Sequence, residues 1–175
     1  GLKLDTPKNE DVRPTTDRVK ESLFNIINPY IIDSNVLDLF AGTGSLGIEC
    51  LSRGASSAIF VDVSKESINI VKSNIKKARV ENESTILNLD FKNAIDRLKI
   101  QNKKFDIIFM DPPYYKNMFI DALSSIDEAD LLCDDGIIVV EHDTKDKFVD
   151  KIGRLEKTRD KKYGNTTLTF YKLEE

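Results

Sequence analysis

Short apolar runs rich in Val, Ile and Phe recur along the chain, and more polar segments separate them. The runs cover residues 36–40, 58–61, 85–89, 105–110 and 137–140. Continuous apolar runs of this length are typical of strands buried on both faces, as in a parallel sheet. Two intervening segments have apolar residues at helical spacing: Ile68, Val71 and Ile75, then Phe119, Leu123 and Ile126. The alternation predicts an α/β fold with a doubly wound, mostly parallel sheet.

The two ends of the chain follow a different pattern. Near the start, an apolar helical face formed by Val19, Leu23, Ile26 and Ile27 follows Pro14-Thr15-Thr16. A threonine hydroxyl there can cap the first turn, which predicts a helix before the first strand. Near the end, residues 154–163 and 166–173 flank Gly164-Asn165, a pair that favours a turn. This pattern predicts a C-terminal antiparallel hairpin.

Length and composition limit the possible classes of protein. The chain has 175 residues, 40% of them apolar and 32% charged, which predicts one globular domain over residues 1–175. One histidine and two cysteines exclude a disulfide framework, a Cys-rich zinc site and catalysis by two histidines, and we expect no metal. His142 and Cys50 are interpreted as structural residues. No apolar run approaches the roughly 18 residues of a membrane span, so we expect a cytoplasmic protein without a membrane partner.

A glycine-rich segment, VLDLFAGTGSLG, covers residues 36–47 and follows the first predicted strand. Its Gly42, Gly44 and Gly47 match the spacing of loops that bind dinucleotides, although a tight turn without any ligand has the same spacing. Asp38 favours S-adenosylmethionine over NAD as the ligand of this loop. A carboxylate facing this loop would repel the pyrophosphate of NAD, whereas it would attract the ammonium and sulfonium of S-adenosylmethionine. The predicted cofactor-binding residues here are Asp38, Phe40, Ala41, Gly42, Thr43 and Gly44.

Two further carboxylates follow the next two predicted strands. Asp62, with Val63 beside it, closes the second strand, where a carboxylate can accept hydrogen bonds from ribose hydroxyls. Asp90, followed by Phe91, comes after the third strand, where it could accept a hydrogen bond from an adenine amino group or cap a helix. Three carboxylates at the ends of successive strands predict a nucleoside-binding edge of the sheet.

The fourth predicted strand ends in Asp111-Pro112-Pro113-Tyr114. Two prolines fix the backbone and leave carbonyl acceptors free, and an aromatic ring stands beside them. Such a turn suits an exocyclic amine of a nucleobase: Asp111 and the Pro112 carbonyl accept its hydrogens while Tyr114 stacks on the base. The alternative is a strand-terminating turn with a surface tyrosine. Late acids such as Asp143 and Asp146 are interpreted as solvated surface.

Taken together, these motifs resemble class I S-adenosylmethionine-dependent methyltransferases that act on amino nitrogens and have a Rossmann-like fold. VRPTTDRVKESLFN (12–25), LGIECLSRGA (46–55) and YGNTTLTFY (163–171) are similar to the bacterial 16S rRNA guanine-N2 methyltransferase D family. The resemblance covers nearly the whole chain. Members of that family usually have a further strand or hairpin before the position of Gly1.

The resemblance implies methylation of N2 of one guanine in 16S rRNA, within a partly assembled small ribosomal subunit, by a monomeric enzyme. It also implies that residues 1–30 lie beside the catalytic turn. Arg13, Thr15, Thr16 and Arg18 are therefore predicted to bind the substrate or the methionine end of the cofactor.

Three other functions remain open at this point. The DPPY turn does not distinguish guanine N2 from adenine N6 or another nucleic-acid amine. An NAD-linked oxidoreductase lacks an evident catalytic Tyr-Lys or His pair, and a catalytically silent cofactor-binding RNA or assembly factor is compatible with the sequence.

The net charge is -4, from 26 bases and 30 acids, but it is unevenly distributed. Residues 121–150 contain ten acids and two lysines, a net of -8, so the other 145 residues carry +4. The charge pattern excludes a protein that coats RNA indiscriminately and permits one with a local basic surface.

Overall fold

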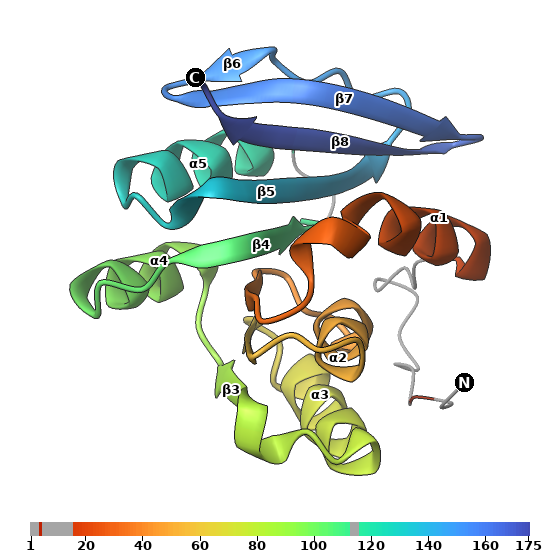
Figure 1. Ribbon diagram of the computed structural model, residues 1–175. Coiled ribbons are helices and arrows are strands. Elements are labelled where there is room, and N and C mark those ends of the chain that lie inside the picture. The colour runs from red at the N-terminus through yellow and green to blue at the C-terminus, as the bar shows by residue number, and fades with distance from the viewer. Residues whose placement is uncertain (1–3, 5–15, 113–115) are drawn as a thin grey trace.

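The structure is a computed structural model that describes residues 4, 16–112 and 116–175. Within these residues, eight strands form one sheet in the order β3-β2-β1-β4-β5-β8-β7-β6 (Figure 1). The strands are β1 (Asn35–Asp38), β2 (Ser57–Val61), β3 (Ser84–Leu87), β4 (Phe105–Met110), β5 (Leu132–Asp143), β6 (Lys151–Ile152), β7 (Leu155–Tyr163) and β8 (Thr166–Leu173). Strands β1 to β5 pair in parallel, whereas β8 pairs antiparallel with both β5 and β7. The predicted sheet and the C-terminal hairpin are confirmed.

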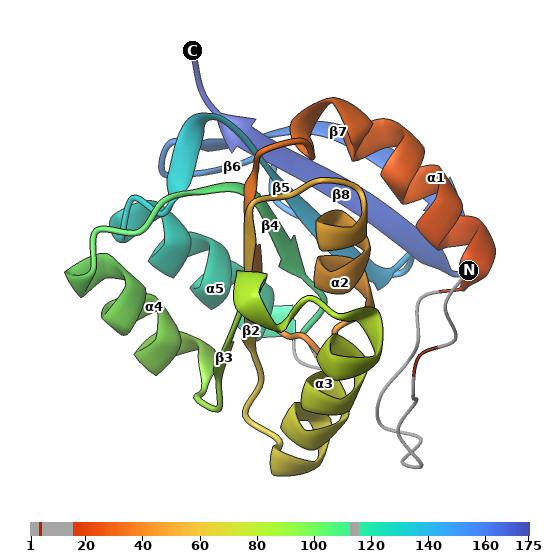
Figure 2. The same cartoon turned by 60° about the horizontal axis from the view of Figure 1, so that its bottom comes forward.

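Helices cover both faces of the sheet. They are α1 (Asp17–Ile27), α2 (Ser45–Ser52), α3 (Lys65–Ala78), α4 (Phe91–Ile100) and α5 (Lys116–Glu128). Figure 2 shows α1, α2 and α3 on one side of the sheet and α4 and α5 on the other. One buried cluster accordingly joins Leu23, Ile48 and Val71, and the other joins Leu98 and Ile126. Strand residues alternate between the two clusters, which is why the strands read as continuous apolar runs.

The helix predicted before the first strand is confirmed as α1. Thr16 is its N-cap, and its hydroxyl oxygen accepts a hydrogen bond from the backbone N–H of Val19 at 3.4 Å. Val19, Leu23 and Ile27 are buried against the sheet, as their spacing predicts, and Ile26 is half-buried. Cys50 is fully buried in the same cluster, in agreement with a structural role.

The ends of three strands, β1, β3 and β5, differ by more than one residue from the apolar pattern. β3 ends at Leu87 instead of residue 89, and β5 begins at Leu132 instead of residue 137. β1 ends at Asp38 instead of residue 40, because the backbone leaves the ladder there: the N–H of Ala41 bonds to the carbonyl of Val61 at the end of β2. β5 continues to Asp143, three residues beyond its last apolar position. This extension is polar, and it is held by pairing with β8, a partner distant in sequence.

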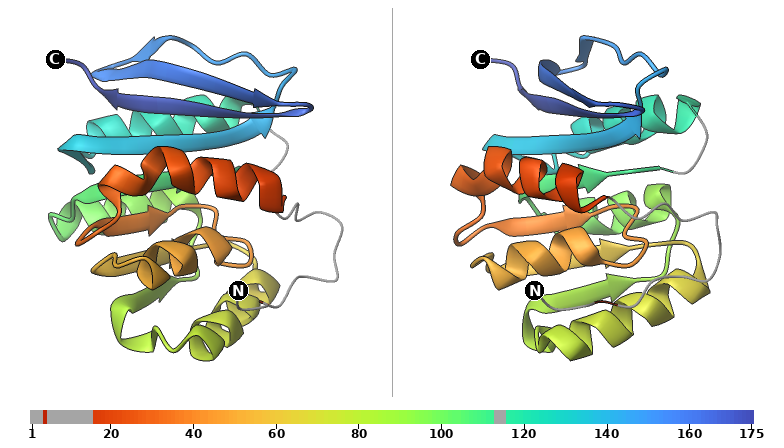
Figure 3. Two further views of the ribbon diagram at one scale, coloured as in Figure 1. Left: turned by 45° about the vertical axis from the view of Figure 1, so that its right-hand side comes forward. Right: turned by 90° about the vertical axis from the view of Figure 1, so that its right-hand side faces the viewer.

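Several separate segments meet at the carboxyl ends of the parallel strands. Figure 3 shows the N-terminal end of α1 and the tip of the β7–β8 hairpin at this same edge. The fold therefore brings the start of α1 and the turn between β7 and β8 to the place where ligands bind in doubly wound sheets. Among the described residues, no helix is long and apolar enough to cross a membrane.

Candidate active site

A cavity of about 1170 Å³ opens at this edge of the sheet. Ligand pockets commonly enclose about 300–1,000 Å³, so the cavity has room for a nucleoside cofactor and part of a second ligand. Most of the predicted site residues line it: Thr16, Asp38, Phe40, Ala41, Gly42, Thr43, Asp62, Val63, Asp90, Phe91, Asp111 and Pro112. Gly44 and Arg18 do not line the wall. Arg13, Thr15, Pro113 and Tyr114 lie outside the described residues.

Glycine is required at each of the three positions after β1 for a different structural reason. Gly42 and Gly44 have φ values of 59° and 80°, in the left-handed region that favours glycine. Gly47 lies in α2, where a Cβ atom would come within 2.5 Å of a ring carbon of Phe60 in β2. The third glycine therefore permits close packing of α2 on the sheet, and the first two shape the loop that lines the cavity.

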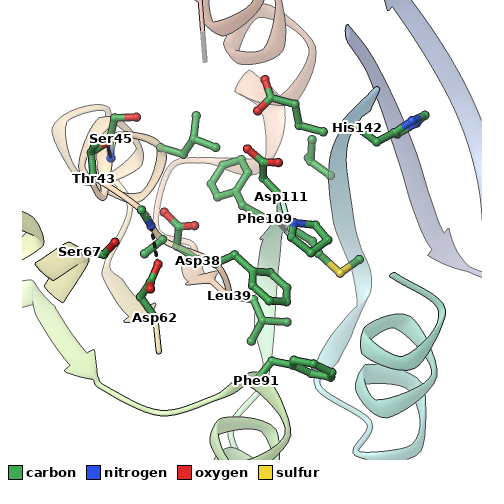
Figure 4. Close-up of a pocket in the computed structure, with 18 of the residues that line it drawn as sticks. Asp38, Leu39, Thr43, Ser45, Asp62, Ser67, Phe91, Phe109, Asp111 and His142 are labelled. Carbon is green, nitrogen blue, oxygen red and sulfur yellow. Dashed lines mark hydrogen bonds between the residues drawn. The ribbon is translucent and has the colours of Figure 1, made fainter. Parts of the chain in front are cut away.

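Asp62 ties the end of β2 to the glycine loop. Its Oδ2 accepts a hydrogen bond from the Gly42 N–H at 2.9 Å (Figure 4). Its Oδ1 accepts one from the Ser64 N–H, also at 2.9 Å. Burial raises the pKa of the Asp62 carboxyl, and these two N–H groups offset part of the rise. Each carboxylate oxygen can accept more than one hydrogen bond, so Asp62 can still bind a hydroxyl group in the cavity.

Asp38 is a buried carboxyl group at the end of β1. Its Oδ2 lies 3.4 Å from the backbone nitrogen of Gly47, which donates to it. Burial, with a smaller contribution from the neighbouring Asp62 and a partial offset by the Gly47 N–H, raises the pKa of Asp38 to about 8. Asp38 is therefore mostly neutral at pH 7 without a ligand, and a cation bound beside it would stabilise the ionised form.

The structure also identifies a residue that holds the glycine loop from α3. Asn74 is fully buried, and its side-chain amide donates a hydrogen bond to the Thr43 carbonyl at 2.9 Å. Sequence reasoning missed Asn74. A polar residue on the buried face of a predicted helix is the signal that could have found it.

Asp90 is the N-cap of α4, which confirms one of its two interpretations. Its Oδ1 accepts a hydrogen bond from the Asn93 N–H at 2.8 Å. Next to it, the Phe91 ring lies 5.7 Å from the Phe40 ring, and Val63 is 72% exposed. These side chains form an apolar wall near Asp90, which fits a flat aromatic ligand.

Asp111 continues from the end of β4, and Figure 4 shows its side chain in the same cavity as Asp38 and Phe109. Pro112 is buried behind it. Glu141, at the extended end of β5, also lines the cavity, although sequence reasoning ended that strand one residue earlier. A search for carboxylates following every predicted strand would have found it.

The wall near Asp111 is completed by residues that were not predicted to belong to the site. They are Val19 and Leu23 of α1, Met118 and Phe119 of α5, and Thr166 and Leu168 of β8. Asp143 and Asp146, interpreted from the sequence as solvated surface, are half-buried and line the cavity as well. The polar end of β5 and the turn after it fold back toward the site.

His142 is held by hydrogen bonds on both ring nitrogens. Nε2 lies 2.7 Å from the Thr169 hydroxyl oxygen, and Nδ1 lies 2.8 Å from the Asp143 carbonyl oxygen. The ring packs against Phe148, with 4.1 Å between ring centroids, and burial lowers its pKa. Figure 4 shows it turned toward β8. The hydrogen bonds support a structural role.

A doubly wound sheet in which the antiparallel β8 lies between β5 and β7, with a glycine loop after β1, defines the Rossmann-like fold of class I methyltransferases. The family model described as Conserved hypothetical protein 95 matches residues 1–172. Ribosomal RNA small subunit methyltransferase D of Haemophilus influenzae is 41% identical over 150 residues, which cover 84% of this chain and 76% of the relative.

The protein of the same name from Escherichia coli is 30% identical over 174 residues, covering 99% of this chain and 86% of the relative. The solved structure of a conserved hypothetical protein from Streptococcus pyogenes has a TM-score of 0.82 and 35% identity, covering 90% of this chain and 96% of its own. The chain belongs to the ribosomal RNA small subunit methyltransferase D family.

Proposed function

We propose that this chain transfers a methyl group from S-adenosylmethionine to the exocyclic N2 amine of a guanine in 16S rRNA. The names of the relatives from Haemophilus influenzae and Escherichia coli support an rRNA methyltransferase. The observation that carries the proposal is that Asp111 shares one cavity with the glycine loop, Asp38 and Asp62. A methyl donor held by the loop and an amine held at Asp111 would therefore lie next to each other.

The described residues fit S-adenosylmethionine in size, shape and charge. In this proposal Asp62 accepts hydrogen bonds from the ribose hydroxyls, Val63 and Phe91 contact the adenine ring, and Asp90 accepts a hydrogen bond from its amino group. Asp38 faces the positively charged methionine part, which enters beside the loop formed by Phe40, Ala41, Gly42, Thr43 and Gly44. The raised pKa of Asp38 supports this assignment, because a buried neutral carboxyl ionises most readily when a cation comes to it.

On the substrate side, the Asp111 carboxylate and the Pro112 carbonyl would accept the two hydrogens of the amine. The lone pair of that nitrogen is delocalised into the base, and these acceptors would direct it toward the methyl group. The nitrogen–carbon bond forms as the sulfur–carbon bond breaks, and the proton then leaves the nitrogen for Asp111 or water. Pro113 and Tyr114 are proposed to complete the turn, with Tyr114 stacked on the base.

The first helix and the segment before it are proposed to position the substrate. Thr16 lines the cavity. Arg18 lies in the first turn of α1, one turn before Ser22, at the edge of the sheet where the cavity opens. Arg13 and Thr15 belong to the same proposed segment. We further propose that a monomer acts in the cytoplasm on a partly assembled small subunit, without a metal.

Methyl transfer to adenine N6 is the second candidate reaction, because an Asp-Pro turn accepts either exocyclic amine. The experiment that separates the candidates supplies S-adenosylmethionine with a labelled methyl group. The purified chain is tested with free rRNA and with partly and fully assembled small subunits, followed by nucleoside analysis. We expect label in N2-methylguanosine. Label only in N6-methyladenosine would contradict the guanine assignment, and cofactor binding without any transfer would support a silent binding module.

A further inference from the structure

The tip of the β7–β8 hairpin lies against α1 at the edge where the cavity opens. The Ser22 hydroxyl of α1 is hydrogen-bonded to the Tyr163 hydroxyl at the end of β7. Thr166, the first residue of β8, lines the cavity together with Thr16 of α1. Figure 3 shows the hairpin tip and the first turn of α1 on the same side of the molecule. The hairpin tip and α1 thus form one rim of the cavity.

The pairing of β7 with β8 places two basic residues on the α1 side of the hairpin. Arg159 pairs with Phe170, and Lys161 pairs with Leu168. Residues paired across two strands point to the same face, and Leu168 and Phe170 pack in the cluster that contains the buried face of α1. Tyr163 follows two residues after Lys161 on that face. Arg159 and Lys161 therefore lie on the same face of the hairpin as Tyr163, which contacts α1.

On the helix, Arg18 lies four residues before Ser22, so both side chains occupy one face of α1. Arg18, Arg159 and Lys161 are hereafter called the basic rim. All three are exposed. Within the part of the chain that the structure describes, no ion pair involves them, whereas Arg154 and Lys157 of the same hairpin are paired with acids. The basic rim is therefore available to an external anion.

The charge inside the cavity is of the opposite kind. Among the described residues, Asp62, Glu66 and Asp90 line it, and no lysine or arginine does. A phosphate backbone would be repelled from such a wall, whereas a single uncharged base can enter. The phosphates on either side of that base must then remain outside, next to the rim of the cavity.

From this arrangement we infer that the basic rim binds the phosphates that flank the methylated nucleotide, while the acidic cavity takes the base. The inference rests on the proposed function, since it supposes that the partner is RNA. It assigns to Arg159 and Lys161, which carry no sequence motif, a role in holding the substrate together with Arg18. They are positioning residues, because they touch the RNA backbone and not the reacting atoms.

The test compares two triple variants of the full chain. Arg18→Gln, Arg159→Gln and Lys161→Gln together remove the basic rim. The control removes three exposed bases from the opposite edge of the sheet: Arg97→Gln, Lys99→Gln and Lys103→Gln. Both variants change the net charge equally, and all six side chains are exposed, so both are expected to fold. A thermal unfolding measurement checks this.

Binding of an rRNA fragment is measured by fluorescence anisotropy over a series of salt concentrations. Each phosphate contact contributes about 0.7 to the slope of log affinity against log salt for single strands, so loss of the rim should lower that slope by about 2. We expect at least tenfold weaker RNA binding and a correspondingly raised KM for RNA. The double variant Arg159→Gln/Lys161→Gln, which keeps Arg18, should retain kcat at saturating RNA and the affinity for S-adenosylmethionine within about twofold, and the control should match the wild type.

Equal effects of the two variants, or none from the rim variant, would overturn the inference while leaving the proposed function standing. If the wild-type protein binds RNA through the basic rim but transfers no methyl group, the proposed function is contradicted and the inference about the basic rim stands. Failure of the wild type to bind RNA at all would overturn both.

Discussion

The glycine-loop half of the cavity is held by hydrogen bonds between the loop backbone and the side chains of Asp62 and Asn74, whereas the half around Asp111 includes α1 from near the start of the chain and β8 from near its end. In the first half, the loop residue Gly42 bonds to Asp62, and Thr43 bonds to Asn74. In the second half, α1, the end of β5 and the start of β8 meet around Asp111. The difference indicates that a cofactor meets a preformed surface, while the substrate meets a junction that only the complete fold creates.

The largest expected effect comes from the Asp111 half. Asp111→Ala removes the proposed acceptor of the amine hydrogens, so kcat should fall by about 10²–10⁴-fold. Affinity for S-adenosylmethionine should stay within a few-fold, because the glycine loop is untouched. Label transfer gives kcat, and calorimetry gives the affinity. Asp121→Ala, at an exposed position of α5, is the control and should behave like the wild type.

The matching change in the other half should have the opposite profile. Asp62→Ala removes the proposed partner of the ribose hydroxyls and frees the N–H groups of Gly42 and Ser64. A hydrogen bond to a charged group contributes about 1.5–3 kcal/mol, which predicts a loss of cofactor affinity of about 10- to 150-fold. The kcat at saturating cofactor should change much less. If Asp62→Ala instead lost kcat and Asp111→Ala lost affinity, the two halves would have been assigned in reverse.

Asp38 predicts a pH dependence that belongs to the glycine-loop half alone. Its pKa is raised to about 8 by burial, so at pH 7 the free protein carries a proton there that a bound cation would displace. Cofactor affinity should therefore rise by up to about tenfold per pH unit below pH 8 and then level off. Calorimetry in buffers of different ionisation enthalpy measures the released proton. The Asp38→Asn variant cannot release this proton, so any release that it still shows comes from other groups, such as the cofactor's own amino group. Proton release equal to that of the wild type in this variant would contradict the assignment.

The same contrast explains which parts of the site could be predicted from the sequence. Asp38, the glycine loop and Asp62 belong to a single β1–α2–β2 unit, and the residue types there meet local requirements, such as a positive φ at Gly42. Glu141 has no such local signal, and Thr166 and Leu168 lie in the family-like segment 163–171, which implies no role in the site for them. They reach the cavity because β8 pairs with the polar end of β5, a contact between segments about 25 residues apart.

The fold itself was predicted more completely than its boundaries. Each of the five parallel strands carries an apolar run. In β1, β2, β4 and β5 the reason is that helices cover both faces of the sheet, whereas the edge strand β3 is only half-buried. The apolar pattern does not reach the end of β5, because residues 141–143 are polar and are extended by pairing with β8. Asp90 shows the remaining limit: one carboxylate can cap a helix and face a ligand, and sequence does not choose between these roles.

A smaller effect, on stability, tests how tightly the glycine-loop half is built. Gly47→Ala would place a Cβ atom 2.5 Å from the Phe60 ring, so unfolding free energy should fall by about 1–3 kcal/mol from overpacking. Phe60→Leu makes space at the same point. The double variant should therefore lose less than the sum of the two single variants in urea unfolding, and strictly additive losses would contradict a direct clash.

The smallest expected effect concerns His142, beside the Asp111 half. Burial lowers its pKa below the usual value of 6.5, although Asp143, Asp146 and Asp160 act in the opposite direction. A depressed folded-state pKa means that the unfolded chain binds the proton more readily, so this contribution to stability is present above pH 6.5 and is lost as pH falls through the folded-state pKa. The difference in unfolding free energy between wild type and His142→Gln should shrink over that window. A difference that is constant from pH 8 to pH 5 would mean that His142 contributes through packing against Phe148 alone, without any linkage to its proton.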